Sequence, residues 1–457
     1  MFIRLLIALW LAFWASSVAA QADLDVPIDQ ASAVAMRALM AGETTLALQI
    51  ATAVLQQAPD DRNALVIVAA AAPRVGDAPR GLAAGARAWR VSTTETQKYE
   101  AARLTALAAA NAQRFTLATF WLRRALTVAP NEDERTQTLN DARYLTRINP
   151  WSTQLSFSLV PSNNVNGGAE DESSTAPGNP SGTLSEDALA LAGWRASLSF
   201  GAQYRVQEAQ SSRTTVGFAY QTARVWITED TRVPNEAFNT NSYNLSLRHD
   251  RALDNGTLSL RASRGLYEYR DLDLRTQTTN YEKYDIWRLG VDRRYALNER
   301  TLLSFSASHE WLSYLATGIG DVDRVSLSGG ASYRLDAGDR VSATLSLVDS
   351  DGDSVNYTSQ QQTLSVAYSF AEALGPISLS VGGGLKWSDY PEYRLLNAVT
   401  GGRQDTTAFA SASIGFPDIE YAGFTPSLRL DISNTDSNVS RFDRTTFSAG
   451  LTIRSQF

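Results

Sequence analysis

The 457-residue chain contains no cysteine, and this absence removes several kinds of chemistry. Without thiols there are no disulfides, no thiolate metal sites and no lipidated cysteine of the lipoprotein type. The chain is also short of positive charge, because 41 Lys and Arg stand against 48 Asp and Glu, a net charge of −7. Nucleic-acid binders normally present a basic surface, so we expect no nucleic-acid partner.

Histidine is nearly absent too. The two that occur, His249 and His309, lie in segments where apolar and polar residues alternate, and both occupy positions of the apolar set. A hydrolase needs its histidine beside a nucleophile and a third, orienting group, and no such pattern surrounds either residue. The stretch DSDGDS (349–354) lacks the downstream glutamate of a calcium loop, and the GGG at 382–384 precedes no helix. We therefore expect no enzymatic activity, no cofactor and no metal site.

Long apolar runs are missing except at the N-terminus, where Arg4 precedes the apolar stretch Leu5–Trp14 and a small-residue segment ending at Ala20. This order is typical of a cleaved secretory signal peptide, which we predict over residues 1–20. A buried or membrane-anchoring helix is the alternative, but the run is short for a span. The rest of the chain holds no run of about eighteen apolar residues, so we expect no transmembrane helix.

Residues 21–148 are rich in alanine with the spacing of amphipathic helices. Two similar stretches, Glu43–Pro59 and Arg114–Pro130, both end in Ala-Pro, and their prolines lie 71 positions apart. That distance is about twice a 35-residue unit, close to the tetratricopeptide period. The pattern predicts three helix pairs and a closing helix over 131–147, in a tetratricopeptide-like domain or an unspecialised helical bundle. A stacked arrangement would offer a concave surface for peptides.

From residue 149 onward the helical spacing gives way to about fourteen segments in which apolar residues alternate with Ser, Thr, Gly or Arg, such as LLSFSASHEW (302–311). Small polar residues on one face suit a hydrated lumen. The predicted connections alternate between short turns, such as that over 206–214, and mostly longer polar loops, such as that over 270–282. The pattern predicts an antiparallel transmembrane β-barrel of about fourteen strands over 149–457. We expect it in the outer membrane of a Gram-negative cell, with the helical domain in the periplasm.

The last segment, RTTFSAGLTIRSQF (444–457), has period two and must close the barrel onto the first strand, since an open edge is excluded in lipid. Its outward aromatic and aliphatic set resembles the assembly signal of outer-membrane barrels: Phe447, Leu451, Ile453 and Phe457. The resemblance implies barrel assembly machinery and outer-membrane lipid as partners.

The junction INPWSTQLSFSLVPSNNVNGG (148–168) joins a Trp-led strand to an asparagine-rich stretch. It is similar to the barrel start of the surface lipoprotein assembly modulators (the Slam family), on the residues Trp151, Pro161, Asn163, Asn164 and Asn166. The resemblance implies a translocon for surface lipoproteins or related secreted binding proteins, served by periplasmic chaperones. A polysaccharide exporter, which also joins such helices to a barrel, and a passive porin remain alternatives.

Two features of the predicted barrel leave more than one interpretation. The acidic loop over 162–192 is either disordered or folded inward as a plug. Five arginines fall on the polar parity of descending strands near the periplasmic mouth: Arg205, Arg248, Arg294, Arg334 and Arg454. In one interpretation they brace the barrel wall by pairing with lumen acids such as Asp292 and Asp431, or with neighbouring turns. In the other they form a basic ring that steers an acidic segment of the client.

Overall fold

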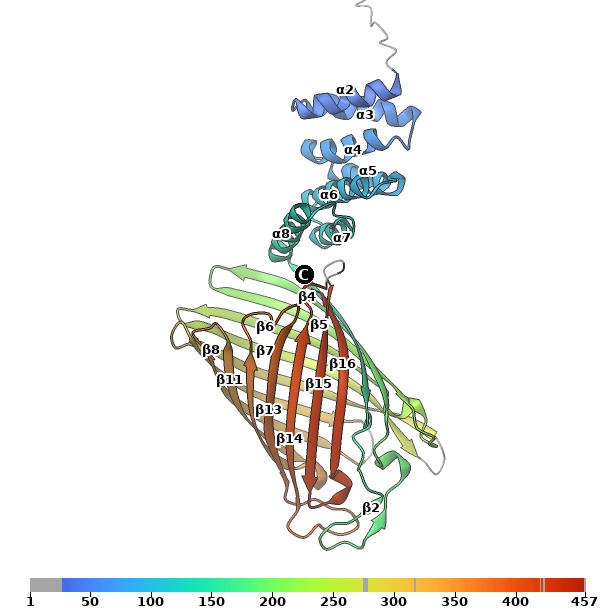
Figure 1. Cartoon of the computed structure of the whole chain (residues 1–457). Helices are drawn as coiled ribbons and strands as arrows, with labels where there is room; N and C mark the ends of the chain where they lie inside the picture. The colour runs from blue at the N-terminus through green and yellow to red at the C-terminus, as the bar shows by residue number, and fades with distance from the viewer. Residues whose placement is uncertain (1–26, 274–277, 316–317, 420, 422–423, 456–457) are drawn as a thin grey trace, which may run out of the picture. The chain divides into compact units, whose positions relative to one another are not determined.

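The computed structural model describes residues 27–457 apart from 274–277, 316–317, 420, 422–423 and 456–457 (Figure 1). The chain divides into two compact units between Leu145 and Thr146. The predicted signal peptide over residues 1–20, like Phe457, lies outside the described residues. Among the described helices none is long and apolar enough to span a membrane.

The first unit is a succession of seven described helices joined by short turns, so the predicted three pairs and closing helix are confirmed as a tetratricopeptide-like domain. They are α2 (Ile28–Met40), α3 (Thr44–Gln57), α4 (Arg62–Ala71), α5 (Ala78–Val91), α6 (Glu95–Asn111), α7 (Phe115–Leu126) and α8 (Glu132–Ile148), with the 3-10 turn η1 (Ala72–Val75) before α5.

Alanine is what lets these helices pack closely. The core is dominated by fully buried alanines around Ile67 and Val68, and at Gly85 even a Cβ would collide with Thr105 of α6. Local caps fix where helices begin: Asp61 accepts the Ala64 N–H at 2.7 Å, and Thr94 forms a capping box with Gln97.

The second unit is a closed antiparallel barrel of fourteen strands, as predicted (Figure 1). Each strand pairs with its neighbours in the chain, and the first pairs with the last. The strands are β1 (Trp151–Ser162), β4 (Gly193–Ala209), β5 (Ser212–Ile227), β6 (Thr240–Leu253), β7 (Gly256–Asp273), β8 (Thr278–Ala296), β9 (Thr301–Tyr314), β10 (Asp321–Arg334), β11 (Arg340–Gly352), β12 (Ser359–Ser369), β13 (Ser378–Tyr390), β14 (Arg403–Gly415), β15 (Phe424–Ser437) and β16 (Arg444–Ser455).

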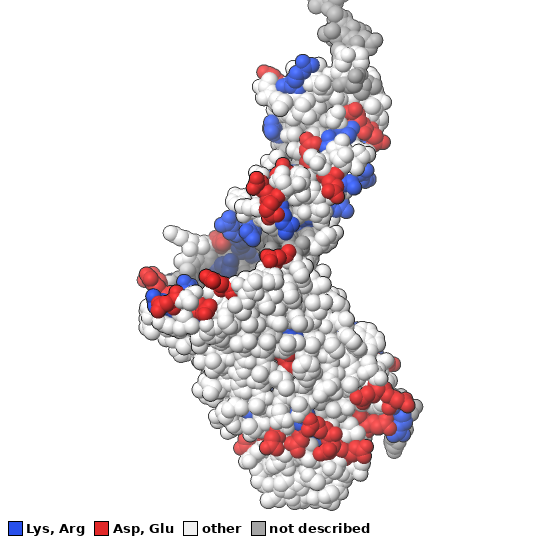
Figure 2. Space-filling model, in the orientation of Figure 1, with Lys and Arg blue, Asp and Glu red and all other residues white. Residues whose placement is uncertain are grey.

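Alternate residues of each strand point outward and inward, which gives the barrel an apolar outer face and a polar lumen. Outward side chains include Leu245, Leu289 and Phe305, which are 60%, 51% and 53% exposed. Inward ones are small and hydroxylated, as where Ser306 and Ser328 approach to 2.7 Å between their Oγ atoms. The visible barrel wall is accordingly almost free of charge over its middle, and Asp and Glu gather towards its two ends (Figure 2). This distribution is what a barrel immersed in lipid requires.

The two barrel ends differ in their connections. We call one the turn end, where β4 and β5 are joined by residues 210–211 and β6 and β7 by residues 254–255. The other is the loop end, where residues 163–192 join β1 to β4. The predicted turn over 206–214 is wrong in its bounds, because strand pairing continues across a bulge between Arg205 and Gln207 into this polar stretch.

Candidate functional site: the barrel lumen and the loop at its end

The β1–β4 loop (residues 163–192) is folded, containing the two-stranded sheet of β2 (Ser173–Ser174) and β3 (Gly182–Thr183) and the 3-10 turn η2 (Glu186–Ala188). The described structure therefore favours the folded interpretation of this loop over the disordered one. The loop begins with the asparagines of the family-like motif, Asn163, Asn164 and Asn166.

Asn163 extends the closure of the barrel beyond the last strand pair. Its Oδ1 accepts the Phe447 N–H at 2.7 Å and its Nδ2 donates to the Thr445 carbonyl at 3.1 Å. Asn164, only 5% exposed, bonds to both the N–H and the carbonyl of Gly168, at 2.9 and 2.8 Å. Each side-chain amide thus donates one hydrogen bond to a backbone carbonyl and accepts one from a backbone N–H, as a backbone amide does between paired strands.

Asn166 ties the two limbs of the loop together. Its Nδ2 donates to the carbonyls of Asp187 and Leu189 at 3.0 and 2.6 Å, and its Oδ1 accepts the Leu191 N–H at 3.0 Å. Of the other two motif residues, Trp151 faces outward with its ring 4.9 Å from that of Tyr204, and Pro161 lies opposite Trp194 in the strand ladder. The asparagines position the loop, whereas Trp151 lies on the outer wall.

The first part of the loop turns into the mouth of the barrel. Two arginines on the lumen face hold it there: Arg195 donates to the Val165 carbonyl and Arg444 to the Gly167 carbonyl, both at 2.8 Å. Val165 and Leu191 also join Val225, 2% exposed on the lumen face of β5, in a small apolar cluster that includes Val233 and Ala237. These contacts narrow the loop end of the lumen.

A second cluster anchors the far part of the loop beside β13 to β16. It contains the buried residues Tyr393, Val399 and Val439, with Phe442 packed against them. Arg403 of β14 lies over Phe442, its Cζ 3.2 Å from the ring centroid. The cation is paired with Asp405 at 2.5 Å, and both side chains are nearly buried. The loop joins this cluster where the Thr400 N–H donates to the Pro177 carbonyl at 2.9 Å.

A charged latch fixes the loop to its other neighbour, the β5–β6 loop. Glu186 accepts from the Arg232 Nε at 2.9 Å, from the Arg232 N–H at 3.0 Å and from the Thr231 hydroxyl at 3.0 Å. These bonds, the Arg232 side chain first, lower the pKa of Glu186 from 4.5 to about 2. A lowered pKa stabilises the bonded state above pH 4.5, and this contribution is lost as the pH falls from 4.5 towards 2. The latch therefore holds at neutral and mildly acidic pH.

Aromatic rings line the lumen face near the loop end on the opposite side of the barrel. Tyr267 stacks on Tyr284 with ring centroids 5.0 Å apart, Tyr284 lies 4.9 Å from Tyr314, and Tyr314 lies 5.4 Å from Tyr357. Beneath them Glu310 bridges arginines of β8 and β10. The lumen is thus lined by tyrosine rings and by charged Arg and Glu side chains as well as by hydroxyl groups.

Four of the five predicted arginines have described side chains, and these four lie on the lumen face near the turn end. The side chain of the fifth, Arg454, lies outside the described residues. Arg205 donates to the Arg147 and Asn149 carbonyls at 2.9 and 2.7 Å, and Arg248 to Asp250 at 2.7 Å. Arg294 and Arg334 occupy inward positions of β8 and β10.

The acids named as their partners pair elsewhere, Asp292 with Arg261 at 2.5 Å and Asp431 with Arg429 at 2.8 Å. The sequence reasoning missed the loop-end cations Arg195, Arg403 and Arg444, although the same parity argument, applied at the other strand ends, would have found them.

The outward set on the terminal strand has the exposure expected of a lipid-facing surface, with Phe447, Leu451 and Ile453 exposed by 51%, 47% and 39%. Its proposed role in assembly stays a prediction.

Comparison with known proteins links this architecture to a family. Residues 151–457 match the family model of the surface lipoprotein assembly modifiers. No curated protein sequence matches the chain. Similar solved structures include OprB of Pseudomonas putida at high pH (11% identity, 70% of this chain and 96% of that one, TM-score 0.39) and OmpT of Vibrio cholerae (9% identity, 67% and 99%, TM-score 0.36).

For the helices, a similar structure is the first tetratricopeptide domain of Spaghetti (RPAP3) bound to an HSP90 peptide (16% identity, 26% of this chain and 90% of that one, TM-score 0.24). Identities this low carry no information on function, so the assignment depends on the family model. Because that model spans the whole barrel, this chain belongs to the surface lipoprotein assembly modifiers, outer-membrane proteins that act in the assembly of surface lipoproteins.

Proposed function

We propose that the protein is a translocon that moves surface lipoproteins, or related secreted binding proteins, across the outer membrane through its barrel. The observation that carries the proposal is the lumen of a fourteen-stranded barrel, lined by small polar and charged side chains and narrowed by a folded loop at one end. Fourteen strands lie between the small barrels that side chains fill and the larger ones that hold an aqueous channel.

In this proposal the turn end faces the periplasm and the loop end faces the outside, the usual arrangement of outer-membrane barrels. The helical unit then meets the client or its chaperones in the periplasm. The β1–β4 loop is the part of the lumen that the client must displace, and the latch at Glu186 and the two apolar clusters set how tightly that loop is held.

The test is display of a lipoprotein in a Gram-negative host that lacks the family. A host that makes both this protein and a surface lipoprotein from the same source should expose the lipoprotein to external protease, whereas a host that makes the lipoprotein alone should keep it protected. The total amount of lipoprotein is the control. Equal protease accessibility in the two hosts, with the barrel present in the outer membrane, would reject the translocon.

The basic residues at the turn end are proposed to steer an acidic segment of the client into the lumen. We expect the double variant Arg294→Gln, Arg334→Gln to slow display several-fold, because a cleft lined by one sign of charge raises the rate of encounter by about ten-fold or more. Arg248→Gln is the matched comparison, because Arg248 is bonded to Asp250 and Ser259 and braces the wall.

The measurement is the initial rate of display at equal barrel abundance. An unchanged rate in the double variant contradicts steering. Loss of the barrel itself would instead show that these arginines brace the wall.

A further inference from the structure

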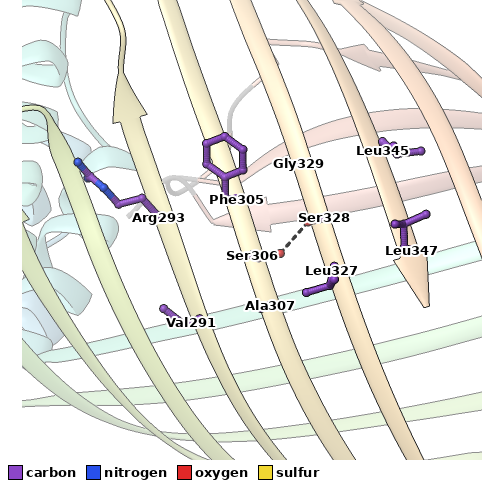
Figure 3. A pocket seen from close by; sticks show the side chains of 10 residues that line it. All are labelled: Val291, Arg293, Phe305, Ser306, Ala307, Leu327, Ser328, Gly329, Leu345 and Leu347. Carbon is purple, nitrogen blue, oxygen red and sulfur yellow. Dashed lines mark hydrogen bonds between the residues drawn. The ribbon is translucent and has the colours of Figure 1, made fainter. Parts of the chain in front are cut away.

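The outer wall of the barrel has a hollow across β8, β9, β10 and β11 (Figure 3). The hollow has a volume of about 480 Å³, within the range of small-molecule sites. Two small outward residues create it, Ala307 of β9 and Gly329 of β10, which lie diagonally across one strand pair. Figure 3 shows them between Phe305 on one side and Leu345 and Leu347 on the other.

The wall around the hollow is apolar and its floor is braced. Phe305, Leu327 and Leu345 are 53%, 50% and 47% exposed, so they stand out from the wall around the two small residues. On the lumen side of the same strands the hydroxyls of Ser306 and Ser328 are 2.7 Å apart, which fixes the two strands that form the floor. The hollow is therefore a built depression in the lipid-facing surface.

One rim of the hollow carries a cation. Arg293 is an outward residue of β8, opposite Phe305 in the register, and lines the hollow. Its guanidinium reaches toward the turn end, where it donates to the Arg294 carbonyl at 2.5 Å, bonds to Asn255 and lies 5.5 Å from the Tyr295 ring. An arginine with its stem on apolar surface and its head at the membrane boundary is the expected arrangement.

The side of the hollow formed by Arg293 and Phe305 lies in the half of the wall nearer the turn end, and its other side, at Leu327 and Leu347, reaches the middle of the strands. Phe305 is close to Thr301, where β9 begins, and far from Tyr314, where it ends. In the proposed orientation this half of the wall faces the periplasmic leaflet, the one from which a lipoprotein delivered from the periplasm must start.

We propose that this hollow seats an acyl chain of the client's lipid anchor, with Arg293 beside the ester and amide carbonyls where the chain joins the peptide. The proposal rests on the proposed function and names where that function holds the lipid part of its client. An acyl chain in a depression contacts more wall atoms than one on a convex surface, and those small dispersion gains add up. The rim guanidinium supplies hydrogen-bond donors to carbonyl oxygens.

The test uses the full-length protein in phosphatidylcholine vesicles and a synthetic diacylated lipopeptide with a diazirine in one acyl chain. After illumination, labelled peptides should map to β8–β11 and not be spread around the barrel. A diacyl phospholipid with the same diazirine is the second probe. It should label the hollow less than the lipopeptide does at equal concentration.

Gly329→Leu is the variant that fills the hollow. A Cβ at Gly329 would lie 3.7 Å from Phe305 Cδ1, an ordinary contact, so the backbone accommodates the new side chain. We expect labelling at β8–β11 to fall by about tenfold, because the space for the chain is gone. Ala410→Leu is the matched control, an outward residue of β14 opposite Ile432, and it should label as the unchanged protein does.

Uniform labelling around the barrel, unchanged labelling in Gly329→Leu, or equal labelling by the phospholipid would overturn the proposal. The display assay separates this failure from failure of the proposed function. If the unchanged protein displays its client and Gly329→Leu does so equally well despite losing the label, the anchor seat is rejected and the translocon stands. If the unchanged protein displays nothing, the translocon fails whatever the labelling shows.

Discussion

Replacing residues 164–191 with a short glycine-serine linker should raise the ion conductance of the barrel in a planar bilayer by about tenfold, since fourteen strands enclose a wider lumen than the eight-stranded barrels that side chains fill. The exchange removes Val165 and Leu191 from the mouth and frees Arg195 and Arg444 from the carbonyls they hold. The barrel itself should persist, because β1 and β4 stay paired along the whole of β1.

A smaller excision shows which part of the loop narrows the lumen. Removing residues 170–187 keeps the segment inside the mouth but deletes the contact with Thr400 and the latch at Glu186. We expect this variant, and Glu186→Gln alone, to conduct only slightly better than the complete protein and to fluctuate more. Equal conductance in all these proteins and the complete one would show that the loop does not obstruct the lumen.

Removing the helical unit should abolish display while leaving the barrel in the membrane. A protein that keeps its signal sequence but lacks residues 24–145 retains Arg147 and Asn149, whose carbonyls accept from Arg205. The barrel pairs its own backbone groups without the helices, so a heat-modifiable band should persist in the outer-membrane fraction. Display should fall to the level of the host without the protein.

The reason is that the helices carry the candidate surface for a client or chaperone. A cleft of about 530 Å³ lies between α6 and α8, lined by Tyr99, Glu100, Arg103 and Glu134 among others. Charged and aromatic side chains in one cleft suit a peptide segment better than a lipid. Full display by the barrel alone would assign client selection to the lumen.

The strands could be read from the sequence because period-two alternation survives wherever one face meets lipid and the other meets water. It fails where a hairpin leaves the membrane. The predicted loop over 270–282 is mostly strand, with β7 reaching Asp273 and β8 starting at Thr278, and the polar stretch around 206–214 is paired as well. In both places backbone pairing continues although neither face is apolar, so the pattern gives no signal.

The site was harder to predict than the strands because its contacts depend on register. The motif asparagines were identified, but the bond from Phe447 to Asn163 joins residues 284 positions apart, and local sequence does not reveal it. The outer hollow likewise forms only because the register makes Ala307 and Gly329 diagonal neighbours on adjacent strands. The sequence of either strand alone does not determine that register.

The pairing of β1 with β16 has a consequence for the order of folding. Every other strand pair in the barrel joins segments that follow each other in the chain, whereas this one joins Ser156 to Arg454. Pairings of such high contact order form slowly, because the entropy of closing the intervening chain must be overcome first.

β1 is the first strand of the barrel and β16 the last, so one edge of β1 stays unpaired until the strands between them are in place. The bonds of Asn163 to Thr445 and Phe447 belong to this last step. We expect the closing seam to be the kinetically slowest element of the molecule and the one most dependent on assistance during biogenesis.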